Sequence, residues 1–311
     1  MIEVQNLLKK YGDFTAVDRI SFTAKKGEIV GLLGPNGAGK TTTMRILTGY
    51  MPPTAGTARI AGHDVTADSM AARQAVGYLP ERVPLYPDMT VEAYVAFWAQ
   101  LRGVRRPKAQ VEAVLKRVQL FDRRRTLIRN LSKGMRQRLG LAQALVHQPP
   151  VLILDEPTIG IDPQQVIEVR EMVREFGSAH TVLLSTHILS EAEQVCDRVL
   201  IINQGRIVAQ GKPSALRQQF EPGEHLFVAM EGGRGNPAAV LQSVTAVASV
   251  TPVEGGFQVR IKPKHDGRGA IFDAVVGAGW RLTEIRAISG ALEDVFLELV
   301  ERDKPPGAKP G

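Results

Sequence analysis

The chain has 311 residues, and its 44% of hydrophobic and 23% of charged residues are typical of a folded protein with room for one large and one small domain. It has no apolar run long enough to span a bilayer, no basic start or apolar core of an export signal, and one cysteine, Cys196, so we expect a cytoplasmic protein without a disulfide framework. The net charge is +7, and the basic residues are unevenly distributed along the chain, with an excess in residues 102–138.

The first third of the chain is predicted to be rich in strands. Short apolar runs at Ile2–Leu8 and Ala16–Thr23 flank a turn at residues 11–13, and a third run, Glu28–Leu33, has the composition of a buried strand. Further strands are expected at Gly56–Ile60 and Ala75–Leu79.

A glycine-rich loop follows the third run and precedes a helix predicted at Lys40–Leu47. It matches the phosphate-binding pattern G-x-x-x-x-G-K-[ST], in which backbone N–H groups surround phosphate oxygens, the lysine reaches the outer phosphates and the last hydroxyl binds Mg²⁺. We therefore expect ATP and Mg²⁺ here. The residues predicted to bind the nucleotide are Gly34, Asn36, Gly37, Ala38, Gly39, Lys40, Thr41 and Thr42.

Helical periodicity begins at Thr90, a predicted N-cap for Val91–Leu101, and continues with helices at Ala109–Val118 and from Ser132 to about residue 146. Residues 102–138 hold thirteen Lys or Arg and two acids, a net charge of +11, so the rest of the chain carries −4. Such a segment suits lipid or nucleic-acid phosphates or an acidic partner, and it is equally typical of a solvated helical face.

The third of these helices begins with the motif Leu131–Met135. Ser132 can cap this helix, and Gly134 leaves its backbone N–H unshielded by a side chain, so the helix N-terminus is predicted to bind an anion.

Two later runs end in polar residues. Val151–Leu154 is predicted to be a buried parallel strand, and Asp155 at its carboxyl end is a predicted Mg²⁺ ligand. Glu156 is predicted to polarise the water that attacks the γ-phosphate. If the run Thr181–Thr186 forms the neighbouring strand, His187 lies close enough to contact the γ-phosphate and to orient Glu156.

Strands and helices alternate in this part of the chain, as is typical of a parallel α/β sheet. The remaining predicted elements are helices at Pro163–Phe176 and Ser190–Cys196 and a strand at Val199–Ile202. Beyond Phe220 the pattern changes to βαββαβ followed by a helix, which fits a small α+β ferredoxin-like domain. Its predicted elements are strands at Leu226–Met230, Val244–Pro252, Phe257–Ile261 and Arg281–Ile288, and helices at Pro237–Ser243, Gly269–Val276 and Leu292–Glu301.

The ordered motifs resemble the ATP-binding-cassette (ABC) ATPases over residues 1 to about 220. The resemblance implies a P-loop nucleotide-binding domain over residues 1–220 with a helical subdomain at about 88–148. It further implies that Ser132 and Gly134 contact the γ-phosphate bound by a second subunit, that Tyr11 stacks on adenine, and that Asp162 lies in the loop between subunits. We expect an accessory or dimerisation domain at 221–303, although it could instead bind a ligand or add surface, and a disordered tail at 304–311.

The chain departs from the family pattern at two places. Lys133 and Met135 replace a glycine and the glutamine of Leu-Ser-Gly-Gly-Gln, and Glu81 stands where a Mg²⁺-sensing glutamine is usual. These departures and the carboxyl-terminal Leu292–Leu299 sequence resemble the branch that drives ABC-2-type exporters, including gliding-motility-like and antibiotic-export ATPases.

The leading hypothesis is therefore an ATP-hydrolysing motor subunit that forms a head-to-tail homodimer under separate integral membrane permease subunits. It would act at the cytoplasmic face of the inner membrane, where the basic segment could contact anionic lipid. The alternative is a soluble ABC ATPase that acts on nucleic acid or ribosomes, but such proteins usually carry two cassettes or a long coiled-coil insertion, and this chain has neither. A third, regulatory hypothesis, in which ATP binds without hydrolysis, depends on the altered signature.

Overall fold

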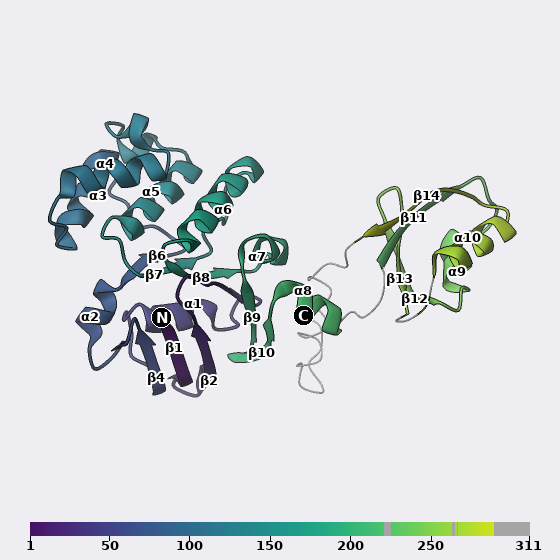
Figure 1. The fold of residues 1–311 in the computed structure, drawn as a ribbon, viewed down its shortest axis with the longest axis horizontal. Coiled ribbons are helices and arrows are strands. Elements are labelled where there is room, and N and C mark those ends of the chain that lie inside the picture. The colour runs from purple at the N-terminus through teal and green to yellow at the C-terminus, as the bar shows by residue number, and fades with distance from the viewer. Residues whose placement is uncertain (221–224, 263–264, 266, 289–311) are drawn as a thin grey trace. The chain divides into compact units, whose positions relative to one another are not determined.

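The computed structural model describes residues 1–220, 225–262, 265 and 267–288 (Figure 1). One compact unit covers Met1–Pro213 and a second begins at Ser214. The helix expected at Leu292–Glu301 and the tail at 304–311 lie outside the described residues. Among the helices of the described ranges, none combines the length and the apolar character needed to cross a membrane.

The first unit contains an antiparallel sheet in the order β2-β1-β4-β5. Its strands are β1 (Ile2–Tyr11), β2 (Phe14–Ala24), β4 (Ala55–Ile60) and β5 (His63–Asp64). β1 and β2 form a hairpin in which Tyr11 pairs with Phe14. Its turn contains Gly12 at a φ of 58°, a left-handed conformation that glycine adopts without strain.

The central sheet has the order β10-β9-β3-β8-β7-β6. Its strands are β3 (Ile29–Leu33), β6 (Val76–Leu79), β7 (Val151–Asp155), β8 (Thr181–Thr186), β9 (Arg198–Asn203) and β10 (Arg206–Gly211). The pairs from β9 to β6 are parallel, as the alternating pattern predicts, and β7 and β8 are neighbours. Edge strand β10, which the sequence analysis missed, runs antiparallel to β9 through a tight turn with positive φ at Gln204 and Gly205.

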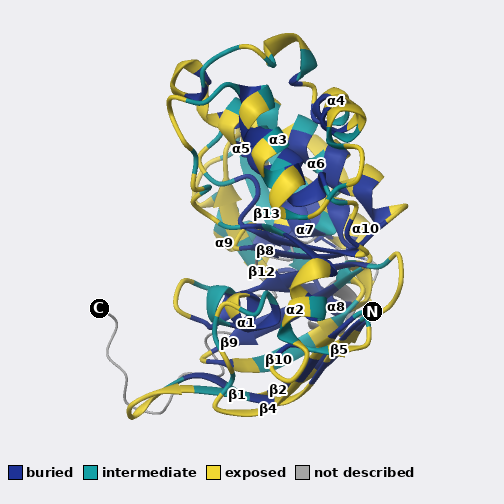
Figure 2. Ribbon diagram, turned by 90° about the vertical axis from the view of Figure 1, so that its left-hand side faces the viewer, coloured by how far each residue is buried: buried dark blue, intermediate teal, exposed yellow. Residues whose placement is uncertain are grey.

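Helix α1 (Lys40–Leu47) lies between the two sheets (Figure 2). Its Met44, Ile46 and Leu47 are buried in one apolar core with side chains from the antiparallel sheet and from β3 and β7. This packing holds the N-terminus of α1, and so the glycine-rich loop before it, at the carboxyl edge of the central sheet. The short helix α2 (Ser69–Gln74), which was not predicted, lies between β5 and β6.

Helices α3 (Val91–Leu101), α4 (Pro107–Arg117) and α5 (Lys133–Leu145) pack against one another in the predicted helical segment. Thr90 caps α3 by accepting a hydrogen bond from the Ala93 N–H, and Ser132 caps α5 through the Met135 N–H, so both predicted caps are confirmed. Two short 3₁₀ helices, Phe121–Arg123 and Ile128–Asn130, connect α4 to α5.

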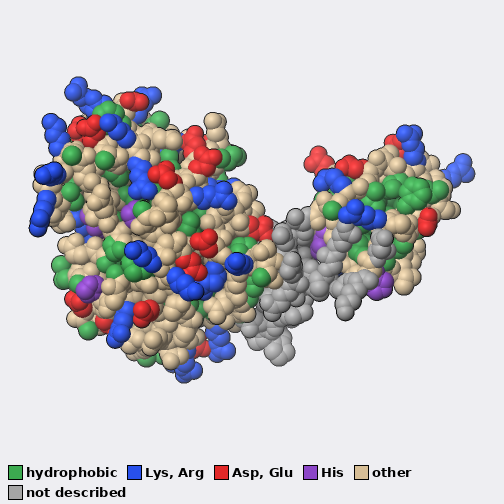
Figure 3. All heavy atoms as spheres, viewed as in Figure 1, with side chains coloured by type: hydrophobic (Ala, Val, Ile, Leu, Met, Phe, Trp, Pro, Cys, Tyr) green, Lys and Arg blue, Asp and Glu red, His purple; other side chains and the backbone are tan. Residues whose placement is uncertain are grey.

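The basic side chains of this segment lie over the surface of α3, α4 and α5 (Figure 3). Several have acidic partners: Arg117 pairs with Glu175, Arg129 with Asp88, and Arg138 with Glu168. Because these partners lie outside residues 102–138, the local charge is lower than the sequence count alone suggests.

Helices α6 (Pro163–Gly177) and α7 (Leu189–Val195) follow β7 and β8, within one or two residues of the predicted bounds. Helix α8 (Pro213–Phe220) follows β10, and the boundary between the two units falls at its first residue.

In its described residues beyond α8, the second unit contains a four-stranded antiparallel sheet in the order β12-β13-β11-β14, and the helices α9 and α10. The elements are β11 (His225–Glu231), α9 (Pro237–Gln242), β12 (Val247–Val253), β13 (Gly256–Ile261), α10 (Arg268–Gly277) and β14 (Arg281–Ile288). This is the predicted βαββαβ arrangement. The prediction that β12 begins at Val244 was wrong, because the N–H of Val244 bonds to Leu241 and that of Val247 to Val244 in a turn after α9.

Candidate functional site

A cleft of about 560 Å³ opens at the carboxyl edge of the central sheet. Its walls come from the β1–β2 hairpin, the glycine-rich loop, and the loops that follow β6, β7 and β8. The lining residues are Tyr11, Phe14, Ala16, Pro35, Asn36, Gly37, Gly39, Lys40, Thr41, Thr42, Glu81, Glu156, Ile159 and His187.

The glycine-rich loop is held close to neighbouring backbone. A Cβ at Gly34 would collide with the carbonyl oxygen of Ile202, and Gly39, at a φ of 105°, would place one against the carbonyl oxygen of Ala16. Only glycine fits these two positions, so the loop conformation depends directly on the sequence. Lys40 is 6% exposed, and its Nζ donates to the carbonyl oxygen of Gly34 at 2.7 Å.

Asp155 ends β7 and pairs in register with Ser185, the penultimate residue of the neighbouring strand β8. The Ser185 hydroxyl donates to Asp155 Oδ1 at 2.5 Å, and the Thr41 hydroxyl lies 3.4 Å from the same oxygen. Thr41 and Asp155 thus bring two oxygen ligands of the kind that Mg²⁺ prefers to one point beside the glycine-rich loop. Burial, together with the nearby Asp155 carboxylate, raises the pKa of Tyr78 on β6 to about 12, so this phenol stays protonated.

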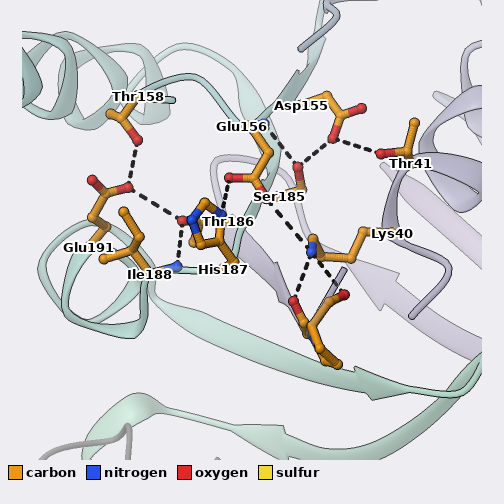
Figure 4. Close-up of polar contacts among 12 residues, drawn as sticks. Lys40, Thr41, Asp155, Glu156, Thr158, Ser185, Thr186, His187, Ile188 and Glu191 are labelled. Carbon is orange, nitrogen blue, oxygen red and sulfur yellow. Dashed lines mark hydrogen bonds and ion pairs between the residues drawn. The ribbon is translucent and has the colours of Figure 1, made fainter. Parts of the chain in front are cut away.

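Glu156 leaves β7 with a φ of 49°, and its N–H donates to Ser185 Oγ at 2.9 Å. Its carboxylate lies between two nitrogen groups, with Oε1 at 3.6 Å from Lys40 Nζ and Oε2 at 2.9 Å from His187 Nδ1 (Figure 4). The His187 side chain is 45% exposed and faces the cleft. The predicted proximity of His187 and Glu156 is confirmed. A carboxylate held in this way can accept a proton from a water molecule in the cleft.

Tyr11 and Glu81, both predicted site residues, line the cleft. Tyr11 is 47% exposed, which leaves a ring face available for stacking, and its hydroxyl lies 3.0 Å from Met51 Sδ. Phe14, 63% exposed and directly across the hairpin, is a second aromatic wall that the sequence analysis missed. The sequence could have indicated this role, because Phe14 directly follows the Gly12-Asp13 turn, across from Tyr11.

Six predicted site residues do not line this cleft. Gly34, Ala38 and Asp155 belong to the glycine-rich loop and to the end of β7, directly beside lining residues, whereas Ser132, Gly134 and Asp162 belong to the first turns of α5 and α6. Ser132 caps α5, and Asp162 caps α6 by accepting the Gln165 N–H at 3.0 Å. A Cβ at Gly134 would collide with the Gln165 side chain, so the N-termini of α5 and α6 lie side by side. Ser132 and Asp162 are exposed at these helix N-termini, whereas Gly134 is buried between them.

Ser185 was also missed as a site residue, although it is fully buried and connects Asp155 to the backbone of Glu156. The sequence could have indicated this role, because Ser185 lies near the end of the apolar run that was expected to neighbour the strand of Asp155.

The chain is similar to known proteins over almost its whole length. A family model described as "ABC transporter" matches residues 17–159. The linearmycin resistance ATP-binding protein LnrL of Bacillus subtilis (strain 168) is 33% identical over 307 residues, which cover 97% of this chain and 99% of that protein. The chain belongs to the ABC transporter ATP-binding proteins.

Two further comparisons extend this result. The Nod factor export ATP-binding protein I of Burkholderia orbicola (strain AU 1054) is 40% identical to this ABC protein over 257 residues, 82% of this chain and 83% of the relative. The dimeric structure of MJ0796, a bacterial ABC transporter cassette, matches with a TM-score of 0.62 and 25% identity over 68% of this chain and 98% of that one. The ABC protein described here is the ATPase subunit of a transporter.

Proposed function

We propose that this ATPase works as a head-to-tail homodimer in which each ATP is bound between two copies of the chain. The observation that carries the proposal is the separation of the site into two surfaces. The cleft holds the glycine-rich loop, Glu156 and His187, whereas Ser132 lies outside the cleft at the exposed N-terminus of α5, and Gly134 is buried two residues further on beside the Gln165 side chain. A helix N-terminus attracts phosphate, so a second copy can complete the site. The dimeric arrangement of the related cassette MJ0796 supports this assembly.

Within one half-site, the phosphates are bound by the loop N–H groups and by Lys40. Thr41, Asp155 and Glu81 would hold Mg²⁺, which would supply positive charge to neutralise the phosphate oxygens. Glu156 orients the attacking water and accepts its proton, while His187 contacts the γ-phosphate and keeps Glu156 in place.

The remaining contacts complete the nucleotide site. Asn36, Gly37, Ala38 and Thr42 belong to the phosphate loop, and Tyr11 stacks on adenine. Ser132 and Gly134 come from the partner copy, and Asp162 lies where the copies meet.

The protein drives a separate membrane permease, and the names of relatives that refer to export and resistance favour an exporter. A second cleft, of about 450 Å³, offers a surface for this partner. Tyr50, Met70 and Leu101 on its walls are 75%, 67% and 61% exposed, and no acid is among the lining residues. Exposed apolar patches of this kind mark protein contacts. The subunit would thus lie at the cytoplasmic face of the inner membrane, held there by the permease.

The basic segment contacts anionic lipid headgroups beside the permease in this proposal. A nucleic-acid partner is disfavoured because the chain belongs to the ABC transporter ATP-binding proteins and its relatives are named for resistance and export. Duplex DNA and RNA binding, measured across a salt titration, provides the comparison: tight binding that weakens steeply with salt would favour the nucleic-acid alternative. The second unit adds contacts between the two copies.

The test of the dimer is ATP-dependent association of Glu156→Gln, measured by light scattering after size exclusion. This variant keeps the side-chain shape but removes the proton acceptor, so ATP and Mg²⁺ should trap a dimer that wild-type protein forms only transiently. A Glu156→Gln protein that stays monomeric in saturating ATP and Mg²⁺ would contradict the proposal. Glu156→Gln with Ser132→Arg, which blocks the partner surface, is the matched control and should remain monomeric.

A further inference from the structure

Glu191, in the first turn of α7, is a buried carboxylate outside the cleft. It is 5% exposed, and the described residues give it three side-chain partners, of which Figure 4 shows Thr158 and Thr186. Thr158 Oγ1 donates to its Oε2 at 2.6 Å, Thr186 Oγ1 donates to the same oxygen at 3.3 Å, and Arg170 Nη2 lies 3.2 Å from Oε1. A buried carboxylate is tolerated only when it is paired and hydrogen-bonded in this way.

These partners connect Glu191 to both sides of the catalytic machinery. Thr186 directly precedes His187, and its hydroxyl also accepts the N–H of Ile188 at 3.0 Å, so the contact fixes the backbone on either side of His187. Thr158 lies two residues after Glu156, in a turn closed by the Ile159 N–H and the Glu156 carbonyl oxygen at 3.2 Å. One carboxylate oxygen therefore joins the loop of His187 to the loop of Glu156.

The His187 side chain needs this support. It is 45% exposed, and within the described part of the chain its hydrogen-bond partner is Glu156, so its place depends largely on the loop that carries it. A displacement of about 1 Å in a catalytic group can lower a rate by roughly 100-fold. Arg170 lies on α6, whose N-cap Asp162 belongs to the surface proposed to meet the partner copy, so Glu191 also contacts the helix that leads there.

We propose that Glu191 is a positioning residue for ATP hydrolysis, which holds the His187 loop against the turn after Glu156 so that both side chains face the γ-phosphate together. This inference rests on the proposed roles of Glu156 and His187. It predicts a loss in kcat rather than in nucleotide binding, because Glu191 does not line the cleft or touch the phosphate loop.

The test compares Glu191→Ala with Glu191→Gln in the full-length protein. Steady-state phosphate release gives kcat and KM, and a fluorescent ATP analogue gives Kd. Glu191→Ala should lower kcat by about tenfold or more with KM and Kd changed less than about threefold. Glu191→Gln keeps an oxygen that can accept from both threonines, so it should recover most of the lost kcat.

Two further variants separate positioning from folding. Thr186→Val removes one hydroxyl at nearly constant volume and should reproduce much of the loss in kcat. Glu168→Ala breaks the Arg138–Glu168 pair between α5 and α6 without touching the His187 loop and should leave kcat within about twofold. Thermal unfolding of each variant identifies any that fail to fold, and Thr186→Val then decides the outcome.

The inference is overturned if folded Glu191→Ala and Thr186→Val keep wild-type kcat, or if kcat, KM and Kd all change together. Failure of the proposed function would look different: Glu156→Gln would stay monomeric in saturating ATP and Mg²⁺, whatever the behaviour of the Glu191 variants.

Discussion

Ser185→Ala should destabilise the first unit and impair the active site together. The Ser185 hydroxyl is fully buried, donates to the Asp155 carboxylate at 2.5 Å and accepts the Glu156 N–H at 2.9 Å. A hydrogen bond to a charged group is worth about 1.5–3 kcal/mol, and a buried N–H left without an acceptor costs about 1–3 kcal/mol. We expect the free energy of unfolding to fall by about 3 kcal/mol, and Tm by roughly 6–12 °C for a unit of this size.

Differential scanning calorimetry and steady-state ATP hydrolysis measure the two effects on the same preparation. The matched control is Ser178→Ala at the end of α6, where an exposed hydroxyl donates to the Glu175 carbonyl oxygen at 2.7 Å. This control should change stability by less than about 0.5 kcal/mol. If Ser185→Ala were as stable and as active as the Ser178 control, the hydroxyl would not join Asp155 to Glu156, and our description of this edge of the sheet would be incorrect.

Three other predictions concern the cleft and the pH dependence of stability. Tyr11→Ala should weaken ATP binding by about tenfold through lost stacking, whereas Tyr11→Phe should bind normally in a fluorescence titration, and equal effects of the two would exclude stacking. Gly34→Ala should lower ATP affinity in the same titration because its methyl group displaces the loop from the Ile202 carbonyl, and normal affinity would show that the loop tolerates a Cβ. Burial, helped by the nearby Arg102, lowers the pKa of His147 to about 4. As the pH falls from 6.5 towards 4, the imidazole is therefore protonated in the unfolded chain while it stays neutral in the folded protein. The contribution of His147 to stability is complete above pH 6.5, and about 2 kcal/mol of it should be lost between pH 7 and pH 5. Urea unfolding at the two pH values measures this loss, and His147→Gln should reduce it. If the variant and the wild type lost the same free energy of unfolding, the lowered pKa of His147 would not be its source.

Local signals in the sequence were sufficient for elements whose ends are set by nearby residues. Helix α3 has the predicted bounds because Thr90 caps it and its apolar face is regular, and α5 begins at the predicted Ser132. Strand β10 escaped prediction because it is a half-exposed edge strand that pairs with β9. Its signal was the Gln204-Gly205 turn rather than an apolar pattern.

The motifs predicted the chemistry of the site but not the contacts that assemble it. Strand order depends on packing between distant segments, so the sequence alone left the pairing of β7 with β8 as a condition for bringing His187 to Glu156. Ser185 and Glu191 were missed for the same reason: Ser185 contacts Asp155 and Glu191 contacts Thr158, and each partner lies about 30 residues away in the chain. Neither carries a motif of its own.

The most direct test of the shared nucleotide site is complementation between two inactive variants. Lys40→Ala disables the cleft, and Ser132→Arg disables the surface that the partner contributes. If the site is shared, mixing the two proteins produces heterodimers with one intact site, and phosphate release should recover to about a quarter of the wild-type rate. If the mixture stays as inactive as each variant alone while crosslinking shows that heterodimers have formed, one chain holds a complete site and the central claim is wrong.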